Sequence, residues 1–193
     1  MRIKHLLLTL VIVSISFNLH APIRVVDITE EIEMYNKVQK ENKYFKLYKE
    51  SLIVLKEFEG FSLTSYIDVN GKSIGYGHHI QKYENIPNII TEEYAEILLR
   101  IDFEHAISTV EQLTELDRFN NPEKVLALAH FVYNLGSGNF ANSTLLQNVK
   151  NNKCIASEII KWTKIKVDNT IIYSNHLYKR RLYELMLYQN DQI

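Results

Sequence analysis

The sequence predicts an α+β fold in which a small β-hairpin lobe stands against a larger helical lobe with a buried central helix. Signals for β structure are dense only between Ser62 and Ile80. Helical patterns with recognisable start and stop residues fill most of the remaining chain. One of these patterns, from Val125 to Tyr133, is apolar nearly all round, which is typical of a helix enclosed by other elements.

The composition is that of an ordinary globular protein. The 193 residues are 46% hydrophobic and 23% charged, and the formal net charge of -1 provides no basic field for nucleic acid. We therefore expect no nucleic-acid partner. The single cysteine, Cys154, excludes an intramolecular disulfide and a cysteine-based metal cluster, and we expect neither a metal ion nor a cofactor.

The N-terminus carries a short apolar segment. Arg2 and Lys4 precede an uncharged, largely apolar run from Leu6 to Phe17, which is shorter than the roughly 20 residues of a membrane-spanning helix. We expect residues 1–21 to be either a cleaved signal peptide or a retained signal-anchor. The protein is then exported to the periplasm or the extracellular space, and any contact with a membrane runs through this segment alone.

The rest of the chain is expected to form a tether and an N-terminal helix, residues 22–50, followed by one folded domain, residues 51–193. A helix-like pattern begins at Glu30, and we divide it near Asn42. Its second part ends at Glu59, because Gly60 is a typical helix stop.

Local signals mark the later helices. Thr91 followed by two glutamates predicts a helix start, and Pro122 is suited to the first position of the central helix. Gly136 follows the end of that helix. Further helices are expected at about 144–149, 155–163 and 176–189.

A candidate catalytic acid stands at the end of the first long helix. Glu59 is the last residue before Gly60 and lies between Phe58 and Phe61 in the sequence. The negative end of a helix and apolar neighbours both disfavour a carboxylate, so this carboxyl is suited to keep its proton and act as a general acid.

A candidate carboxylate and hydroxyl flank the predicted hairpin turn. Asn70-Gly71 between extended residues predicts a two-residue loop, which places Asp68 opposite Ser73. Such a pair can hold a water molecule, and a protonated carboxyl across a cleft completes the layout of an inverting glycosidase. The alternative is that these are ordinary surface and turn-capping residues.

Three ordered blocks of residues, spanning about 51–187, surround these positions. The first block contains Glu59-Gly60, Tyr66-x-Asp68 and Ser73-Ile74-Gly75-Tyr76-Gly77-His78. The second block runs from Asn134 to Phe140 and continues with Ser143-Thr144-Leu145-Leu146. The third block is Leu177-Tyr178-Lys179-Arg180-Arg181 with Glu184. Together these blocks resemble the phage-type lysozymes, glycoside hydrolase family 24.

The resemblance implies a lysozyme-like fold and a muramidase that cleaves the β-1,4 bond between N-acetylmuramic acid and N-acetylglucosamine in peptidoglycan glycan strands. It implies that Glu59 is the proton donor and that Asp68 is the second carboxylate, which either orients a water or acts as the nucleophile. Ser73 stands where the family usually has a threonine that helps to place the water. We expect the enzyme to act as a monomer.

Two departures from the family pattern support an alternative function. Ser73 stands in place of the usual threonine, and the turn before it is one residue shorter than the usual form, whereas the intact Glu59 and Asp68 count against the alternative. A glycine-rich stretch that commonly follows the family's late tryptophan is also missing after Trp162. The alternative is a lysozyme-like protein that binds peptidoglycan with lost or reduced turnover.

Further polar residues are candidates for binding or for structural roles. Tyr133, Asn142 and Ser143 are candidates for sugar contacts, with core packing and loop capping as the alternatives. His78 is expected to form a buried ion pair or hydrogen bond that holds the hairpin lobe, and His130 to be a hydrogen-bonded core histidine. Lys179, Arg180 and Arg181 are expected on a solvated helix face or as helix-end charges, with contact to acidic wall polymer as a lesser alternative.

Overall fold

The computed structural model describes residues 29–68, 71–167 and 170–190. The predicted signal segment, residues 1–21, lies outside the described residues. The chain divides into two units between Lys37 and Val38, and the described residues of the first unit are the start of a helix. Within the described ranges, no helix has the length and apolar character needed to cross a membrane.

Helix α2 (Thr29–Glu59) leads without a break to the candidate catalytic acid. The predicted interruption near Asn42 is therefore wrong. Tyr44, two residues later, is only 2% exposed and belongs to the hydrophobic core, so packing overrides the weak helix propensity of asparagine. The end of the helix is confirmed, because Gly60 takes a φ of 69° and its N–H donates to the Lys56 carbonyl over 3.1 Å.

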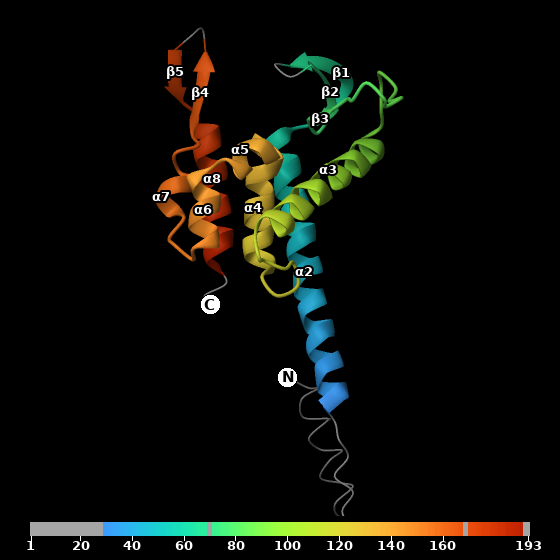
Figure 1. Ribbon diagram of the computed structural model, residues 1–193. Helices are drawn as coiled ribbons and strands as arrows, with labels where there is room; N and C mark the ends of the chain where they lie inside the picture. The colour runs from blue at the N-terminus through green and yellow to red at the C-terminus, as the bar shows by residue number, and fades with distance from the viewer. Residues whose placement is uncertain (1–28, 69–70, 168–169, 191–193) are drawn as a thin grey trace, which may run out of the picture. The chain divides into compact units, whose positions relative to one another are not determined.

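The β lobe is an antiparallel sheet whose strand order, β1-β2-β3, follows the chain. Its strands are β1 (Ser62–Asp68), β2 (Gly71–Gly75) and β3 (His78–His79). They curve above the end of α2 in Figure 1.

The register of the β1–β2 hairpin differs from the predicted one. Asp68 pairs with Gly71 and Tyr66 pairs with Ser73, so the predicted pairing of Asp68 with Ser73 is wrong. Gly71 is the first residue of β2 rather than part of the loop. A Cβ atom on Gly71, whose φ is +132°, would lie 2.9 Å from Cε1 of His79. The glycine therefore allows a close approach of β2 to β3, which sequence alone does not reveal.

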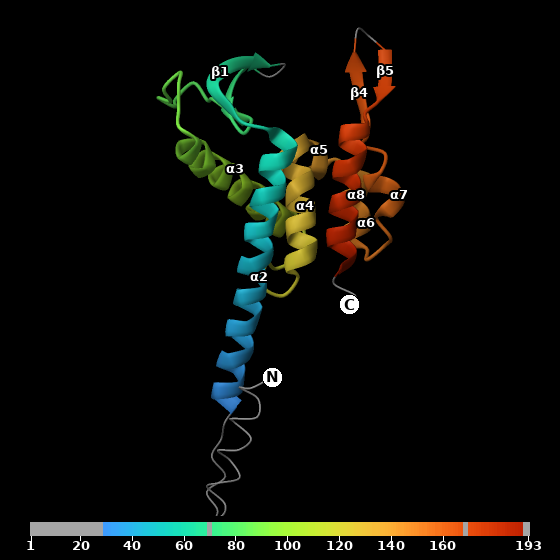
Figure 2. The same ribbon diagram turned by 180° about the vertical axis from the view of Figure 1, so that it is seen from behind.

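The helical lobe is built around α4 (Pro122–Leu135), which packs against α3 (Glu92–Leu113) and α8 (Asn175–Gln189) (Figures 1 and 2). Every residue from Val125 to Phe131 is 0% exposed, which confirms the predicted buried central helix. The predicted start of α3 is also confirmed, because the Thr91 hydroxyl accepts a hydrogen bond from the Tyr94 N–H over 3.2 Å.

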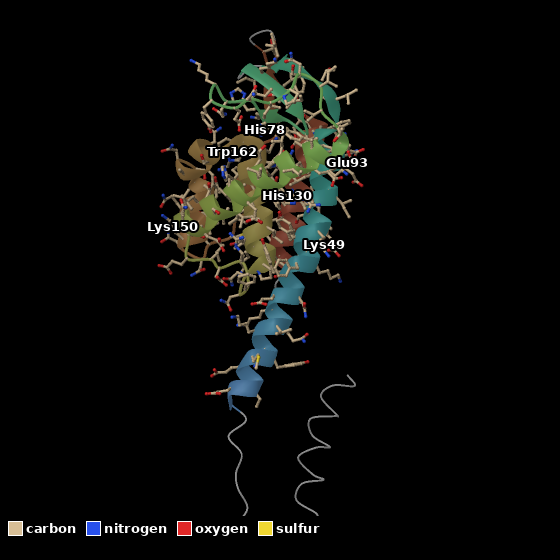
Figure 3. The ribbon with its side chains drawn as sticks, turned by 90° about the vertical axis from the view of Figure 1, so that its right-hand side faces the viewer. Lys49, His78, Glu93, His130, Lys150 and Trp162 are labelled. Carbon is tan, nitrogen blue, oxygen red and sulfur yellow. The ribbon has the colours of Figure 1, made fainter. Side chains whose placement is uncertain are left out.

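Three short helices connect α4 to the C-terminal part of the chain: α5 (Ser137–Ala141), α6 (Thr144–Lys150) and α7 (Ala156–Ile159). Helix α7 is shorter than predicted. Trp162, which is labelled in Figure 3, follows it and packs edge to face on Phe131 of α4, with ring centres 5.4 Å apart. The tryptophan thus joins this segment to the central helix.

A second hairpin, which the sequence interpretation missed, precedes α8. Strands β4 (Lys164–Val167) and β5 (Thr170–Tyr173) pair with each other alone. They occupy the place where the family's glycine-rich stretch was expected. The signal was present in the sequence, because β-branched residues stand on both sides of the turn-forming pair Asp168-Asn169.

Candidate active site

The Glu59 carboxyl lies where α2, the β lobe and α8 meet. Its Oε1 atom accepts a hydrogen bond from Nη1 of Arg180, which is also its ion-pair partner. Its Oε2 atom faces the connection between β2 and β3, since a Cβ atom on Gly77 would lie 3.7 Å from it. The side chain is 21% exposed. The apolar surroundings predicted from Phe58 and Phe61 are thus incomplete, because a guanidinium holds one carboxyl oxygen.

The other two predicted catalytic residues belong to the β1–β2 hairpin. Asp68 is the last residue of β1, and its side chain lies outside the described part of the molecule. Ser73 is 0% exposed in β2, opposite Tyr66. The hairpin therefore brings the backbone positions of Asp68 and Ser73 together, although not as directly opposed residues, and their catalytic roles stay predictions.

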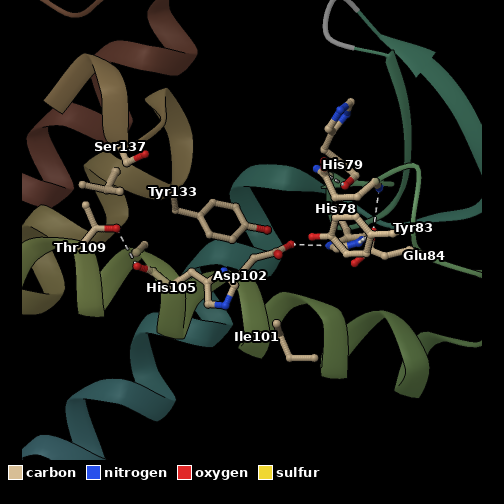
Figure 4. A pocket seen from close by; sticks show the side chains of 14 residues that line it. His78, His79, Tyr83, Glu84, Ile101, Asp102, His105, Thr109, Tyr133 and Ser137 are labelled. Carbon is tan, nitrogen blue, oxygen red and sulfur yellow. Dashed lines mark hydrogen bonds and ion pairs between the residues drawn. The ribbon is translucent and has the colours of Figure 1, made fainter. Parts of the chain in front are cut away.

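Tyr133 lines a pocket of about 360 Å³ that reaches the neighbourhood of Glu59 (Figure 4). The pocket extends from Gly77 to Ser137, and its walls come from the β lobe, α3 and the end of α4. The Tyr133 hydroxyl donates a hydrogen bond to the Tyr76 carbonyl over 2.8 Å. Burial raises the pKa of Tyr133, and the nearby Glu59 charge raises it further, so the hydroxyl stays protonated and acts as a donor.

Asn142 and Ser143 do not line this pocket. Asn142 is exposed at the end of α5, and its side-chain amide donates to the Gly138 carbonyl over 2.9 Å. Ser143 is 6% exposed and caps α6: its hydroxyl donates to the Phe140 carbonyl over 2.7 Å and accepts from the Leu146 N–H over 3.0 Å. The structure thus places Ser143 in a capping role within the loop, which was the alternative to a sugar contact.

His78 ties the β lobe to α3, as predicted. Its Nδ1 atom lies 2.8 Å from Oδ2 of Asp102, and its Nε2 atom lies 3.2 Å from Oε2 of Glu84. Figure 4 shows these contacts at the edge of the pocket. The hydrogen bond to Asp102 raises the pKa of His78, and Glu84 adds to the effect, while burial opposes both.

Arg180 and Arg181 are buried, so the prediction of a solvated helix face is wrong for both. They are 1% and 0% exposed, and Glu184 on the same helix is 0% exposed. Nη2 of Arg181 donates to Oε1 of Glu184 over 2.7 Å and to Oδ1 of Asn134 over 2.8 Å. The sequence carried a weak signal for this arrangement, because residues three and four apart on a helix share a face.

Aromatic rings cover the two guanidinium groups. The Arg180 guanidinium carbon lies 5.4 Å from the ring centre of Phe58, and that of Arg181 lies 4.8 Å from the ring centre of Phe131. A guanidinium is more weakly hydrated than an ammonium and stacks on aromatic faces, which makes its burial tolerable. This explains how two arginines enter the core.

His130 is a core histidine without the predicted hydrogen bonds. It is 0% exposed, and within the described ranges neither ring nitrogen has a hydrogen-bond partner. Its ring contacts Phe103 and Tyr183 edge to face. Burial lowers the pKa of His130 well below its usual range, and the charges of Arg180 and Arg181 lower it further, so the ring is neutral.

Comparison with known proteins identifies the family. A family model described as phage lysozyme matches residues 56–184, a range that includes Glu59, Asp68 and Ser73. The chain belongs to the phage lysozyme family. The three blocks of residues that resemble this family, from Glu59 to Glu184, all lie within the matched range.

Curated endolysins are similar to this phage lysozyme over most of its length. The endolysin of Acyrthosiphon pisum secondary endosymbiont phage 1 is 31% identical over 145 residues, which cover 74% of this chain and 97% of that protein. The endolysin of Bacillus phage B103 is 36% identical over 140 residues, or 70% of this chain. The match covers 51% of the Bacillus phage protein, about half of its length.

Solved structures confirm the α+β lysozyme-like fold. The muramidase domain of SpmX from Asticaccaulis excentricus has a TM-score of 0.63 and 25% identity, covering 72% of this chain and 94% of that one. The endolysin from Escherichia coli O157:H7 phage FAHEc1 has a TM-score of 0.60 and 28% identity, covering 73% and 91%. The protein is accordingly a lysozyme-type glycoside hydrolase, a muramidase that acts on peptidoglycan.

Proposed function

We propose that Glu59 is the proton donor when this phage lysozyme cleaves the β-1,4 bond between N-acetylmuramic acid and N-acetylglucosamine. The position of its carboxyl carries the proposal. One oxygen is held by Arg180, and the other faces Gly77 beside the pocket. A general acid must be fixed within hydrogen-bond reach of the leaving oxygen, and this anchoring meets that need.

The anchoring also determines which oxygen carries the proton. Oε1 accepts from Arg180, and a cation beside an oxygen disfavours a proton there. Oε2, the atom that faces the β2–β3 connection, is therefore the oxygen placed to transfer a proton. The proposal requires the glycosidic oxygen of a bound glycan strand to lie on this side.

Asp68 and Ser73 complete the proposed chemistry from the neighbouring hairpin. Asp68 serves as the second carboxylate and either orients the attacking water or acts as the nucleophile, as its match to the family pattern implies. Ser73 helps to fix the geometry of the hairpin from its buried position in β2. Tyr133, in the pocket wall, offers its ring face to a sugar.

We further propose that the enzyme is exported. Support comes from the apolar run between Leu6 and Phe17 and from the substrate, which lies outside the cytoplasmic membrane. Fractionation of expressing cells and an intact-mass measurement test this proposal. A mature chain that begins after residue 21 indicates cleavage, and a full-length chain in the membrane fraction indicates a retained anchor.

Turnover of purified peptidoglycan by Glu59→Gln tests the catalytic assignment. We expect at least a ~100-fold loss of turbidity clearance and of released reducing ends, because the amide cannot donate the proton. Glu57→Gln is the matched control, since Glu57 is exposed in the same last turn of α2 and should retain full activity.

Two outcomes would change the proposal. Activity that survives in Glu59→Gln would show that the acid lies elsewhere. Binding of peptidoglycan without cleavage by the unaltered chain would instead support the alternative of a wall-binding protein, and Ser73→Thr would then be the next variant to assay.

A further inference from the structure

The buried charges on α8 form a balanced cluster behind the proposed acid. Arg180 and Arg181 supply two positive charges, while Glu59 and Glu184 supply two negative charges. Oε1 of Glu184 lies 2.7 Å from Nη2 of Arg181 and 3.7 Å from Nε of Arg180. Arg180 therefore has a carboxylate on each side: Glu59, which borders the pocket, and Glu184, which lies in the core.

This balance changes when Glu59 takes up a proton. Arg180 is 1% exposed, so its charge cannot be transferred to water when Glu59 becomes neutral. A buried cation that loses one of its acidic partners depends more strongly on the partner that remains. Glu184, 0% exposed and close to the same guanidinium, is the remaining carboxylate that can stabilise that charge.

We propose that Glu184 is a positioning residue that shares Arg180 with Glu59 and thereby sets the pH up to which the catalytic acid keeps its proton. The proposal rests on Glu59 being the proton donor. Glu184 touches neither pocket nor substrate and acts through Arg180 alone. Among the described residues, Nε of Arg180 and Oε2 of Glu184 have no hydrogen-bond partner, so each still has the capacity to bond with the other side chain.

Several titratable groups around the cluster contribute no charge. His130 of α4 and Tyr183 of α8 are both neutral, because burial lowers the pKa of the histidine and raises that of the tyrosine. Tyr133 of α4, which faces Glu59, is neutral for the same reason. Asn134, the remaining polar partner of Arg181, does not titrate. Arg181 is therefore a further charge that acts on the shared guanidinium. On the pocket side, Asp102 of α3 adds a negative charge near Glu59, because both carboxylates act on Tyr133.

The carboxyl of Glu184 itself titrates near neutral pH. Burial raises the pKa of Glu184 to about 7, while Arg181 and Arg180 oppose the rise. Two carboxyls that interact with one cation titrate as a coupled pair. Loss of the Glu184 or the Arg181 charge must therefore change the proton affinity of Glu59, and with it the pH dependence of turnover.

The pH profile of peptidoglycan cleavage tests the proposal with variants of opposite sign. Glu184→Gln leaves two guanidinium groups against one carboxylate, so Glu59 should lose its proton more easily. The alkaline limb of the pH–activity profile, where activity falls as the pH rises, should then move down by about one pH unit. Arg181→Gln leaves one guanidinium against two carboxylates and moves the limb up by a similar amount. Arg181→Lys restores the charge and returns the limb to the position of the unaltered enzyme.

Lys179→Gln is the matched control for a change of one charge on α8. Lys179 is exposed, so salt and water screen it, and the limb should not move. If Glu184→Gln does not fold, Glu184→Asp takes its place, since the shorter carboxylate retreats from Arg180 and shifts the limb in the same direction by less.

The outcomes separate this inference from the proposed function. An inactive Glu59→Gln together with an unmoved limb in a folded Glu184 or Arg181 variant would overturn the sharing of Arg180 and leave Glu59 as the acid. A uniform loss of activity at all pH values would show that Glu184 is only structural and would also overturn it. Activity in Glu59→Gln would contradict the proposed function itself.

Discussion

Two ion-pair clusters hold the lobes of this phage lysozyme, and they differ in how much water reaches them. On α8, Arg180, Arg181 and Glu184 are each at most 1% exposed. At the junction of the β lobe and α3, the His78 side chain is 7% exposed, but its partners Glu84 and Asp102 are 26% and 28% exposed. The first cluster is closed around Arg180, Arg181 and Glu184 and reaches water only at Glu59, which is 21% exposed, whereas the second is open at both of its acidic groups.

The difference shows that burial, more than distance, decides what an ion pair does. Water can stabilise Asp102 or Glu84 when His78 loses its proton, so the open cluster can switch with pH at a small cost in stability. Water cannot replace a partner in the closed cluster, so each missing charge there leaves an uncompensated ion. The four predictions below follow this contrast in order of decreasing effect.

Loss of Arg180 should have the largest effect on stability. Arg180→Ala leaves the buried Glu184 with one cation fewer and Glu59 without its partner, and we expect the free energy of unfolding to fall by about 3–5 kcal/mol. Urea unfolding followed by circular dichroism measures this change. Lys179→Ala on the same helix is the control and should stay within about 0.5 kcal/mol of the unaltered protein. A loss below about 1 kcal/mol for Arg180→Ala would mean that the closed cluster is hydrated.

Removal of Asp102 should cost less and should depend on pH. The pKa of folded His78 is raised, so its contribution is fully present below the unfolded value of about 6.5 and is lost as the pH rises through the folded value. Asp102→Asn should therefore lower the free energy of unfolding by about 1 kcal/mol at pH 6 and by little at pH 9.

Urea unfolding of this variant at several pH values tests the sign of the effect. Glu115→Gln is the matched control, because Glu115 is exposed in the same lobe, and its difference from the unaltered protein should not vary with pH. A difference for Asp102→Asn that grows from pH 6 to pH 9 would contradict the assignment of His78 as the titrating group.

Salt should reduce the effect at the open cluster alone. At about 1 M salt the screening length falls to about 3 Å, so the cost of Asp102→Asn at pH 6 should fall by about half. The cost of Arg180→Ala should stay the same, because ions do not enter the closed cluster. Unfolding of both variants at low and high salt gives the comparison, and equal attenuation would mean that the two clusters are equally accessible.

A pair of the same length whose cation is exposed should have almost no effect. Lys161 and Glu158 are 2.7 Å apart, the same distance as Arg181 and Glu184, but Lys161 is 65% exposed, while Glu158 is 15% exposed. Lys161→Ala should change the free energy of unfolding by about 0.3 kcal/mol. Thermal unfolding is sensitive enough to bound this value, and a cost above about 1 kcal/mol would show that distance matters more than burial.

Local signals predicted most of the helical lobe. The capping residue Thr91, the first-turn proline Pro122 and the apolar run from Val125 each act within a few residues, so their consequences can be read along the chain. The end of α2 at Glu59 was predicted in the same way, since Gly60 alone explains it. These features also place the proposed acid.

Non-local features could not be predicted from the same patterns. The hairpin register depends on the approach of His79 to Gly71, and the burial of Arg180 depends on a partner 121 residues away. Neither contact can be predicted from the residues that are neighbours in the sequence. The β4–β5 hairpin was different, because its β-branched residues were visible in the sequence, but the segment between the helices predicted at about 155–163 and 176–189 was not assigned.

The long separation between Glu59 and Arg180 has a consequence for synthesis of the enzyme. The ribosome makes the proposed acid early and its guanidinium partner 121 residues later, in the last helix. A growing or prematurely ended chain that stops before α8 therefore carries the acid without the charge that orients it. If Glu59 is the acid and Arg180 orients it, the order of the elements along the chain keeps the active site incomplete until α8 has been made.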